Sequence, residues 1–182
     1  MLTEMEVARY RKKALQLYAE ANIVIAEEEK QKIEIADFGF GKFGAVGLSV
    51  LIYVNTKRCC AKELAMLPGQ TCPEHLHPSL SKTKPGKEET FRCRWGKVYL
   101  HVPGPETKNP KTLPPSGFEA GYTVWREIEL KPGEQYTLTP DTLHWFQAGP
   151  DGAVVSEFST SSTDEQDVFT DPAIVRATRI TK

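Results

Sequence analysis

The sequence predicts a mostly β fold, a sandwich or barrel, preceded by an N-terminal helix. Short runs with alternating apolar residues recur from about residue 48 to residue 158, and Pro-Gly or Asp-Gly pairs separate most of them. Many short strands joined by such turns are typical of antiparallel sandwiches and barrels. The chain has 182 residues, of which 40% are apolar, so we expect one domain with a sizeable core.

The first element is an amphipathic helix over residues 3–21. Thr3 is its expected N-cap, and Glu4 and Glu6 suit the positive end of the helix dipole. The expected apolar stripe comprises Met5, Ala8, Ala14, Leu15, Leu17 and Tyr18. Residues 26–31 are also helix-like, and the glycine-rich stretch after residue 37 ends helical character.

The expected strands cover residues 48–53, 62–67, 71–77, 89–102, 123–130, 135–138 and 153–158. The proline-rich stretch 102–117 is too long for a tight hairpin, so we expect an extended loop at one rim. We predict a single domain over residues 1–182. In it, residues 1–36 form a helical extension, 37–160 the barrel and 161–182 a polar tail with a short helix after Pro172.

Composition excludes several classes of protein. A net charge of −1 argues against a surface for nucleic acid or anionic membranes. The four cysteines lack CxxC spacing, which disfavours a disulfide framework or zinc knuckle. There is no apolar run of signal-peptide or membrane-span length, so we expect a soluble, cytoplasmic protein.

Three histidines and one glutamate form a candidate metal site. His75 and His77 are two residues apart on an expected strand, so both point to one face. Glu89 and His144 from later strands complete a shell of three nitrogens and one oxygen. Such a shell leaves coordination positions open for water or substrate, which is typical of a reactive metal centre.

Strand parity selects Glu89 over its neighbour Glu88. Counting by twos from Glu89 reaches Phe91, Cys93 and Trp95, whereas counting from Glu88 reaches polar residues. Glu89 therefore faces the interior, where an unpaired carboxylate is costly and a metal ion would neutralise it. Glu88 is expected at the rim.

Lys62 and Glu157 are candidate catalytic residues. Lys62 shares a strand face with Leu64 and Met66, and Glu157 shares one with Val155, so both charged groups look inward. An interior lysine needs a carboxylate partner or a chemical task. The alternatives are a structural ion pair between them, or exposure at a rim.

Two further residues are candidates for binding a substrate. Phe146 lies on the same face as His144 and could wall a pocket, whereas Trp145 faces the other way. Asp167 is the last residue of the acidic run 164–167. This run could close over the mouth of a pocket, but we favour the simpler interpretation, a solvated loop. The fourth histidine, His101, has no ligand spacing to the others and is expected to be structural or rim-exposed.

The first motif resembles that of the cupin superfamily. Five residues separate Gly69 from His75, His77 follows, and six residues separate Glu89 from Gly96. The gap between His77 and Glu89 is longer than usual. In the second motif, Gly133 and His144 keep the family spacing, but proline is one place late. The resemblance implies a double-stranded β-helix, or jelly-roll, barrel.

Longer runs resemble the bacterial D-lyxose isomerases within that superfamily. They are LPGQTCPEH at 67–75, KEETFRCRWG at 87–96 and EFST at 157–160. The resemblance implies a homodimeric, manganese-dependent isomerase that interconverts D-lyxose and D-xylulose, and also D-mannose and D-fructose. It leaves Co²⁺, Zn²⁺ or Fe²⁺ open as alternative ions.

The expected chemistry is a transfer of hydrogen between C1 and C2 of a sugar, either through a cis-enediol or as a hydride shift. The enediol route needs a general base, for which we predict Glu157, while Lys62 orients or protonates a sugar oxygen. Three other functions stay open: an iron(II) dioxygenase, a non-catalytic sugar-binding cupin, and a phosphosugar isomerase with the lysine-rich loop 82–87 near the phosphate.

Overall fold

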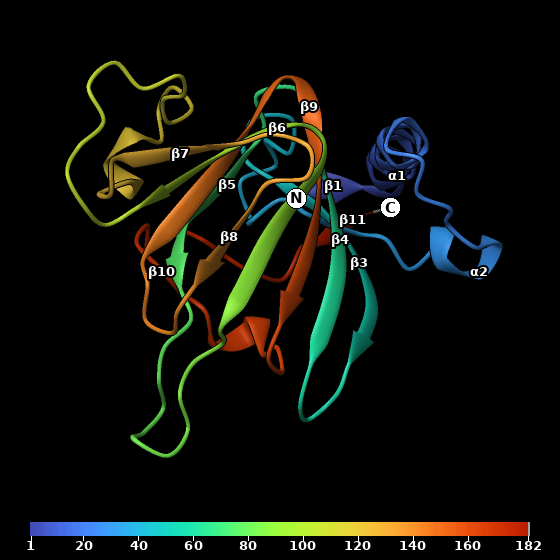
Figure 1. The fold of residues 1–182 in the computed structure, drawn as a ribbon. Coiled ribbons are helices and arrows are strands. Elements are labelled where there is room, and N and C mark those ends of the chain that lie inside the picture. The colour runs from blue at the N-terminus through green and yellow to red at the C-terminus, as the bar shows by residue number, and fades with distance from the viewer. Residues whose placement is uncertain (182) are drawn as a thin grey trace.

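In the computed structural model, which describes residues 1–181, two long strands curl an antiparallel sheet into a barrel (Figure 1). These strands are β6 (Glu89–Val102) and β9 (His144–Ser159), which pair along most of their length. Both bend at glycines: a Cβ at Gly96, where φ is +68°, would lie 2.1 Å from the carbonyl oxygen of Gly152. The bends let one half of β9 pair with β5 and the other with β4.

The other strands are β1 (Leu2–Thr3), β2 (Glu34–Ala36), β3 (Leu48–Asn55), β4 (Cys60–Met66), β5 (Thr71–Leu76), β7 (Arg126–Leu130), β8 (Gln135–Leu138), β10 (Val168–Phe169) and β11 (Ile180–Thr181). The helices are α1 (Glu4–Glu20) and α2 (Glu27–Lys30), with 3₁₀ turns η1 (Glu119–Gly121) and η2 (Asp164–Gln166). One sheet runs in the order β10-β5-β9-β4-β3-β2, with β6 pairing to β7, β8 and β9. The short parallel pair of β1 and β11 joins the two ends of the chain.

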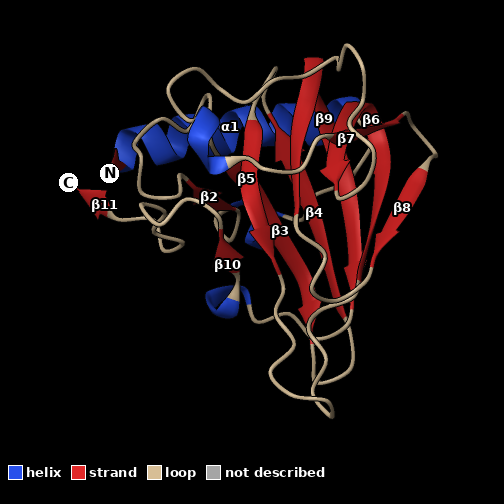
Figure 2. Cartoon of the chain, turned by 90° about the vertical axis from the view of Figure 1, so that its left-hand side faces the viewer, coloured by secondary structure: helices blue, strands red, loops and turns tan. Residues whose placement is uncertain are grey.

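Buried apolar side chains form two clusters. One fills the barrel and includes Leu64, Phe91 and Phe146. The other lies between α1 and the outer face of the sheet, where Tyr18 packs near Leu51. Figure 2 shows α1 lying across the strands. The inner cluster occupies one part of the barrel, which leaves the end that holds the histidines for polar groups.

The predicted N-terminal helix is confirmed. The Thr3 hydroxyl accepts a hydrogen bond from the Glu6 backbone N–H, and the Glu6 carboxylate accepts one from the Thr3 backbone N–H, which closes a capping box. The stripe is partly wrong, because Val7 is buried while Met5 is 81% exposed. Within the described chain, α1 does not reach the length and apolarity that a membrane-spanning helix needs, nor does α2.

The C-terminal tail differs most from expectation. Residues 172–179 contain turns and extended chain rather than the predicted short helix. The tail also returns to the barrel: β10 pairs with β5, and the Thr178 hydroxyl donates to the carbonyl of Ile35. The predicted strand 153–158 is the second half of β9, which starts at His144, and β7 starts three residues later than predicted, at Arg126. The rim loop between β6 and β7 lies opposite α1, as Figure 1 shows.

Candidate metal centre and active site

Strand pairing brings the three predicted histidines together. His75 on β5 is the register partner of His144, the first residue of β9. His77 directly follows the end of β5. All three are buried, and each offers a ring nitrogen within 4.8 Å of the others. Sequence spacing alone could not place His144 beside His75, because it does not determine which strands pair.

Each histidine is held by a hydrogen bond at Nδ1. The His75 Nδ1 atom lies 2.8 Å from the Pro73 carbonyl, and His144 Nδ1 lies 2.9 Å from the Thr142 carbonyl. His77 Nδ1 lies 2.5 Å from Asp167 Oδ1. These acceptors fix the proton on Nδ1, which directs the Nε2 lone pairs inward. Such outer partners are usual for metal-binding histidines.

Glu89 completes the donor set. Its Oε1 atom lies 3.0 Å from both His77 Nε2 and His144 Nε2. The contact with His144 lacks hydrogen-bond geometry, so in the described chain the buried His144 Nε2 has no hydrogen-bond partner. The free lone pair of His144 Nε2 lies beside a buried carboxylate. This arrangement suits a divalent cation that is held by three nitrogens and one oxygen.

The electrostatic environment differs between the histidines. Burial and the neighbouring imidazoles hold the pKa of His75 well below its usual range, so this ligand is already neutral. Burial also lowers the pKa of His77, but the carboxylates of Glu89 and Asp167 outweigh it and raise the pKa to about 9. His77 must therefore release a proton before its Nε2 can bind a cation.

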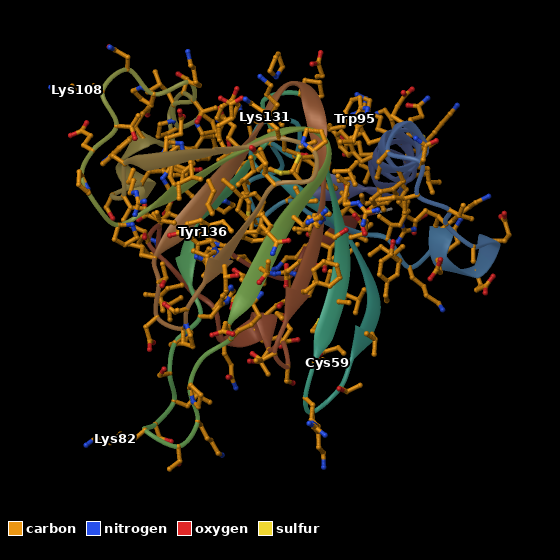
Figure 3. The ribbon with its side chains drawn as sticks, viewed as in Figure 1. Cys59, Lys82, Trp95, Lys108, Lys131 and Tyr136 are labelled. Atoms are coloured by element: carbon orange, nitrogen blue, oxygen red, sulfur yellow. The ribbon has the colours of Figure 1, made fainter. Side chains whose placement is uncertain are left out.

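A small cavity of about 40 Å³ lies beside the donor set. It holds only a few water molecules, since each needs roughly 10–15 Å³ of such volume. His77, Lys87 and Asp167 also line an outer hollow of about 620 Å³. The hollow is lined in part by the hairpin between β3 and β4, which carries Cys59, and by the loop that carries Lys82 (Figure 3).

The two predicted catalytic residues face this cavity together. Lys62 Nζ lies 3.4 Å from Glu157 Oε1, and both side chains are buried. The alternative of rim exposure is therefore wrong. The structural ion pair, the other alternative, is present, which does not exclude chemistry because both side chains also line the cavity.

Lys87 is a cavity residue that the sequence analysis missed. Its ammonium lies 2.6 Å from Glu89 Oε2 and 3.0 Å from Glu157 Oε1. Burial lowers the pKa of Lys87, but Glu157 and Glu89 outweigh it and hold the pKa well above its usual value, so this group is a fixed cation. The parity that selected Glu89 also pointed to Lys87, two residues earlier. Glu88 is exposed, as predicted.

The structure also places the remaining candidates. Phe146 lines the cavity, and Asp167 lies at its edge, bound to His77. The interpretation of residues 164–167 as a solvated loop is wrong for the first and last residues of the run, since Asp164, like Asp167, lines the cavity. His101 is structural rather than rim-exposed. It is fully buried and stacked on Trp145, with ring centroids 3.6 Å apart.

Two solved structures with the same fold are L-ribose isomerases. The L-ribose isomerase of Cellulomonas parahominis aligns with a TM-score of 0.80 and 18% identity, over 99% of this chain and 98% of that one. That of Acinetobacter sp. DL28 aligns with a TM-score of 0.78 and 19% identity over the same shares. The molecule is thus a double-stranded β-helix barrel with a three-histidine cluster beside an internal cavity, and the predicted fold class is confirmed.

The chain belongs to the D-lyxose isomerase family, whose sequence profile matches residues 6–182. It is 59% identical over 180 residues to the D-lyxose/D-mannose isomerase of Thermosediminibacter oceani, covering 99% of both chains. It is 54% identical to the D-lyxose ketol-isomerase of Cohnella laeviribosi, covering 96% of this chain and 94% of that one. The predicted family resemblance is confirmed.

Proposed function

We propose that the protein is a divalent-metal-dependent aldose–ketose isomerase that interconverts D-lyxose and D-xylulose, and also D-mannose and D-fructose. The observation that carries this proposal is the cluster of donors from His75, His77, His144 and Glu89 beside a cavity that Lys62, Lys87 and Glu157 also line. The family membership and the names of its relatives support the reaction class and the sugars. We also propose, from the sequence resemblance, that the ion is manganese and that the protein is a homodimer. From the composition of the sequence, we propose that the protein is cytoplasmic.

A bound divalent ion would polarise the sugar carbonyl and stabilise negative charge that develops on its oxygen. The protein's own groups supply the proton transfer. The Glu157 carboxylate takes the proton from C2 of the aldose, which gives a cis-enediol, and returns it to C1. In the same conversion O1 gains a proton and O2 loses one, so the hydroxyl proton passes from O2 to O1. Its Oε1 atom is held between two ammonium groups, 3.0 Å from Lys87 Nζ and 3.4 Å from Lys62 Nζ. The Lys62 ammonium donates a hydrogen bond to a sugar oxygen.

The cavity favours a free sugar over a phosphorylated one. Its cations Lys62, Lys87 and Arg176 are each paired with carboxylates, so they offer little uncompensated charge for a phosphate. Lys82 and Lys84 in the loop are exposed. Phe146 and other apolar walls suit the carbon chain of a sugar.

The proposal is tested by stripping the protein of metal and assaying ketose formation from D-lyxose under nitrogen, before and after manganese is added. Manganese-dependent D-xylulose formation without oxygen is the expected result. Carrying out the reaction in D₂O distinguishes the two routes: the enediol route incorporates solvent deuterium at C1, whereas a hydride shift does not. Oxygen consumption with sugar and iron, or sugar binding without turnover, would contradict the isomerase assignment.

Glu157→Gln and Glu88→Gln form a matched pair of variants for the same assay. Both remove one carboxylate charge, but Glu157 is buried at the cavity and Glu88 is exposed. We expect Glu88→Gln to keep wild-type kcat and Glu157→Gln to lose most of it, with manganese content equal in both. Equal kcat in the two variants would remove Glu157 from the proposed mechanism.

A further inference from the structure

The C-terminal segment contributes two charged residues to the cavity, Asp164 on η2 and Arg176 beyond β10. Both side chains line the cavity. Arg176 Nη1 lies 2.5 Å from Glu34 Oε1 on β2, and its Nη2 lies 3.3 Å from Asp164 Oδ2. Asp164 in turn contacts Lys62. The segment is therefore tied both to the barrel wall and to a candidate catalytic residue.

Lys62 is held mainly by this segment. Its ammonium donates to both oxygens of Asp164, at 2.9 and 3.1 Å, and to the Ser162 hydroxyl at 3.0 Å. Its distance to Glu157 is longer, at 3.4 Å. The Ser162 hydroxyl also donates to Asp164, which fixes the carboxylate that receives the lysine. Without Asp164, the nearest carboxylate to Lys62 would be Glu157.

The physical consequence follows from the nature of a lysine side chain. Its ammonium is a compact point charge on a flexible four-carbon stem, so its position depends on the partners that hold it. The second carboxylate, Asp164, competes with Glu157 for the ammonium and so limits its movement onto Glu157. Burial raises the pKa of Asp164, but Lys62 and Lys87 outweigh it and hold that pKa well below its usual value, so Asp164 stays charged.

We propose that Asp164 and Arg176 are positioning residues for Lys62: Arg176 anchors Asp164 to Glu34, and Asp164 places the Lys62 ammonium between itself and Glu157. This inference rests on the proposed function for its effect on turnover, and it makes the C-terminal segment a part of the active site. Arg176 acts only through Asp164.

The test is a double-mutant cycle with Asp164→Asn and Arg176→Gln. Displacing a reacting group by about 1 Å can cost up to roughly 100-fold in rate, so we expect kcat to fall about 10- to 100-fold in Asp164→Asn with KM nearly unchanged. Arg176→Gln should lower kcat less, and should add nothing in the Asp164→Asn background. Glu165→Gln and Arg179→Gln, which alter exposed neighbours, are the controls.

Several results would overturn the proposal. If the two kcat effects multiply, Arg176 acts independently of Asp164. If the variants lose only thermal stability, or raise KM with kcat intact, the pair does not position Lys62 for turnover. Asp164→Glu keeps the charge and should recover part of kcat, and it replaces Asp164→Asn in the cycle if that variant does not fold.

An NMR measurement separates this inference from the proposed function. The ammonium signal of ¹⁵N-labelled Lys62, assigned with Lys62→Met, reports whether the group is held, whatever the reaction is. We expect the signal in the wild type and Glu165→Gln, and its loss or shift in Asp164→Asn and Arg176→Gln. An unchanged signal in both variants would contradict the positioning role. Wild-type protein that forms no ketose would contradict the proposed function alone.

Discussion

Asp167→Asn is expected to weaken metal binding rather than sugar binding. The sequence analysis predicted Asp167 as a substrate-binding residue, but its Oδ1 atom lies 2.5 Å from His77 Nδ1, and its side chain is only 10% exposed. A carboxylate in this position fixes the orientation of the imidazole and increases its basicity as a ligand. The effect of the substitution should therefore pass through His77 to the ion.

The size of the effect follows from which parts of the contact survive. Loss of an outer partner of a metal-binding histidine typically costs 10- to 100-fold in metal affinity, or about 1.4–2.7 kcal/mol. Asparagine keeps an acceptor oxygen for the Nδ1 proton but loses the charge, so we expect Asp167→Asn to weaken metal affinity by about tenfold. Asp167→Ala loses both and belongs near 100-fold.

The assay is a titration of manganese into metal-stripped protein, followed by electron paramagnetic resonance of the free ion. Glu165→Gln, on the neighbouring exposed turn, is the control and should bind manganese like the wild type. At saturating manganese we expect kcat and KM of Asp167→Asn to approach wild-type values. Unchanged manganese affinity together with a raised KM for D-lyxose would refute this reasoning and restore the substrate-binding role.

Three further predictions follow from buried groups. Glu157→Gln should lower kcat by at least about 100-fold, since general acid–base catalysis contributes roughly that much, with metal content by elemental analysis unchanged. Lys87→Met should cost about 3–5 kcal/mol of unfolding free energy in the metal-free protein, because it leaves Glu89 and Glu157 without their shared cation. Wild-type stability in urea would count against this. Burial lowers the pKa of His101 to about 4, so the unfolded state takes up a proton first as pH falls below about 6.5. The contribution of His101 to the unfolding free energy, measured as the difference between the wild type and His101→Gln, should then fall by about 3 kcal/mol between pH 6.5 and 4.

The sequence predicts the parts of the site that depend on local periodicity. His75 and His77 share a face because they are two residues apart, and the same parity separates inward Glu89 from exposed Glu88. The structure agrees at each of these positions. Lys87 has the same parity, but Pro85-Gly86 marks a turn, so the pattern places this lysine in the loop 82–87 rather than on the inward face of the strand.

The parts that depend on tertiary structure were not predictable. Asp164 and Arg176 lie in a polar segment with no apolar period, and Arg176 reaches Glu34 across 142 residues of chain. The sequence predicts only the second half of β9, because Asp151-Gly152 is typical of a turn. In the structure, Gly152 lies in a bend of one continuous strand, where its φ of +96° suits glycine.

The proposed metal centre can be located by X-ray diffraction from crystals of the manganese-loaded protein, recorded at the manganese absorption edge. We expect one anomalous peak within bonding distance of the Nε2 atoms of His75, His77 and His144 and of a Glu89 oxygen, beside Glu157 and Lys62. An active, manganese-loaded protein whose peak lies elsewhere, or is coordinated without Glu89, would contradict it.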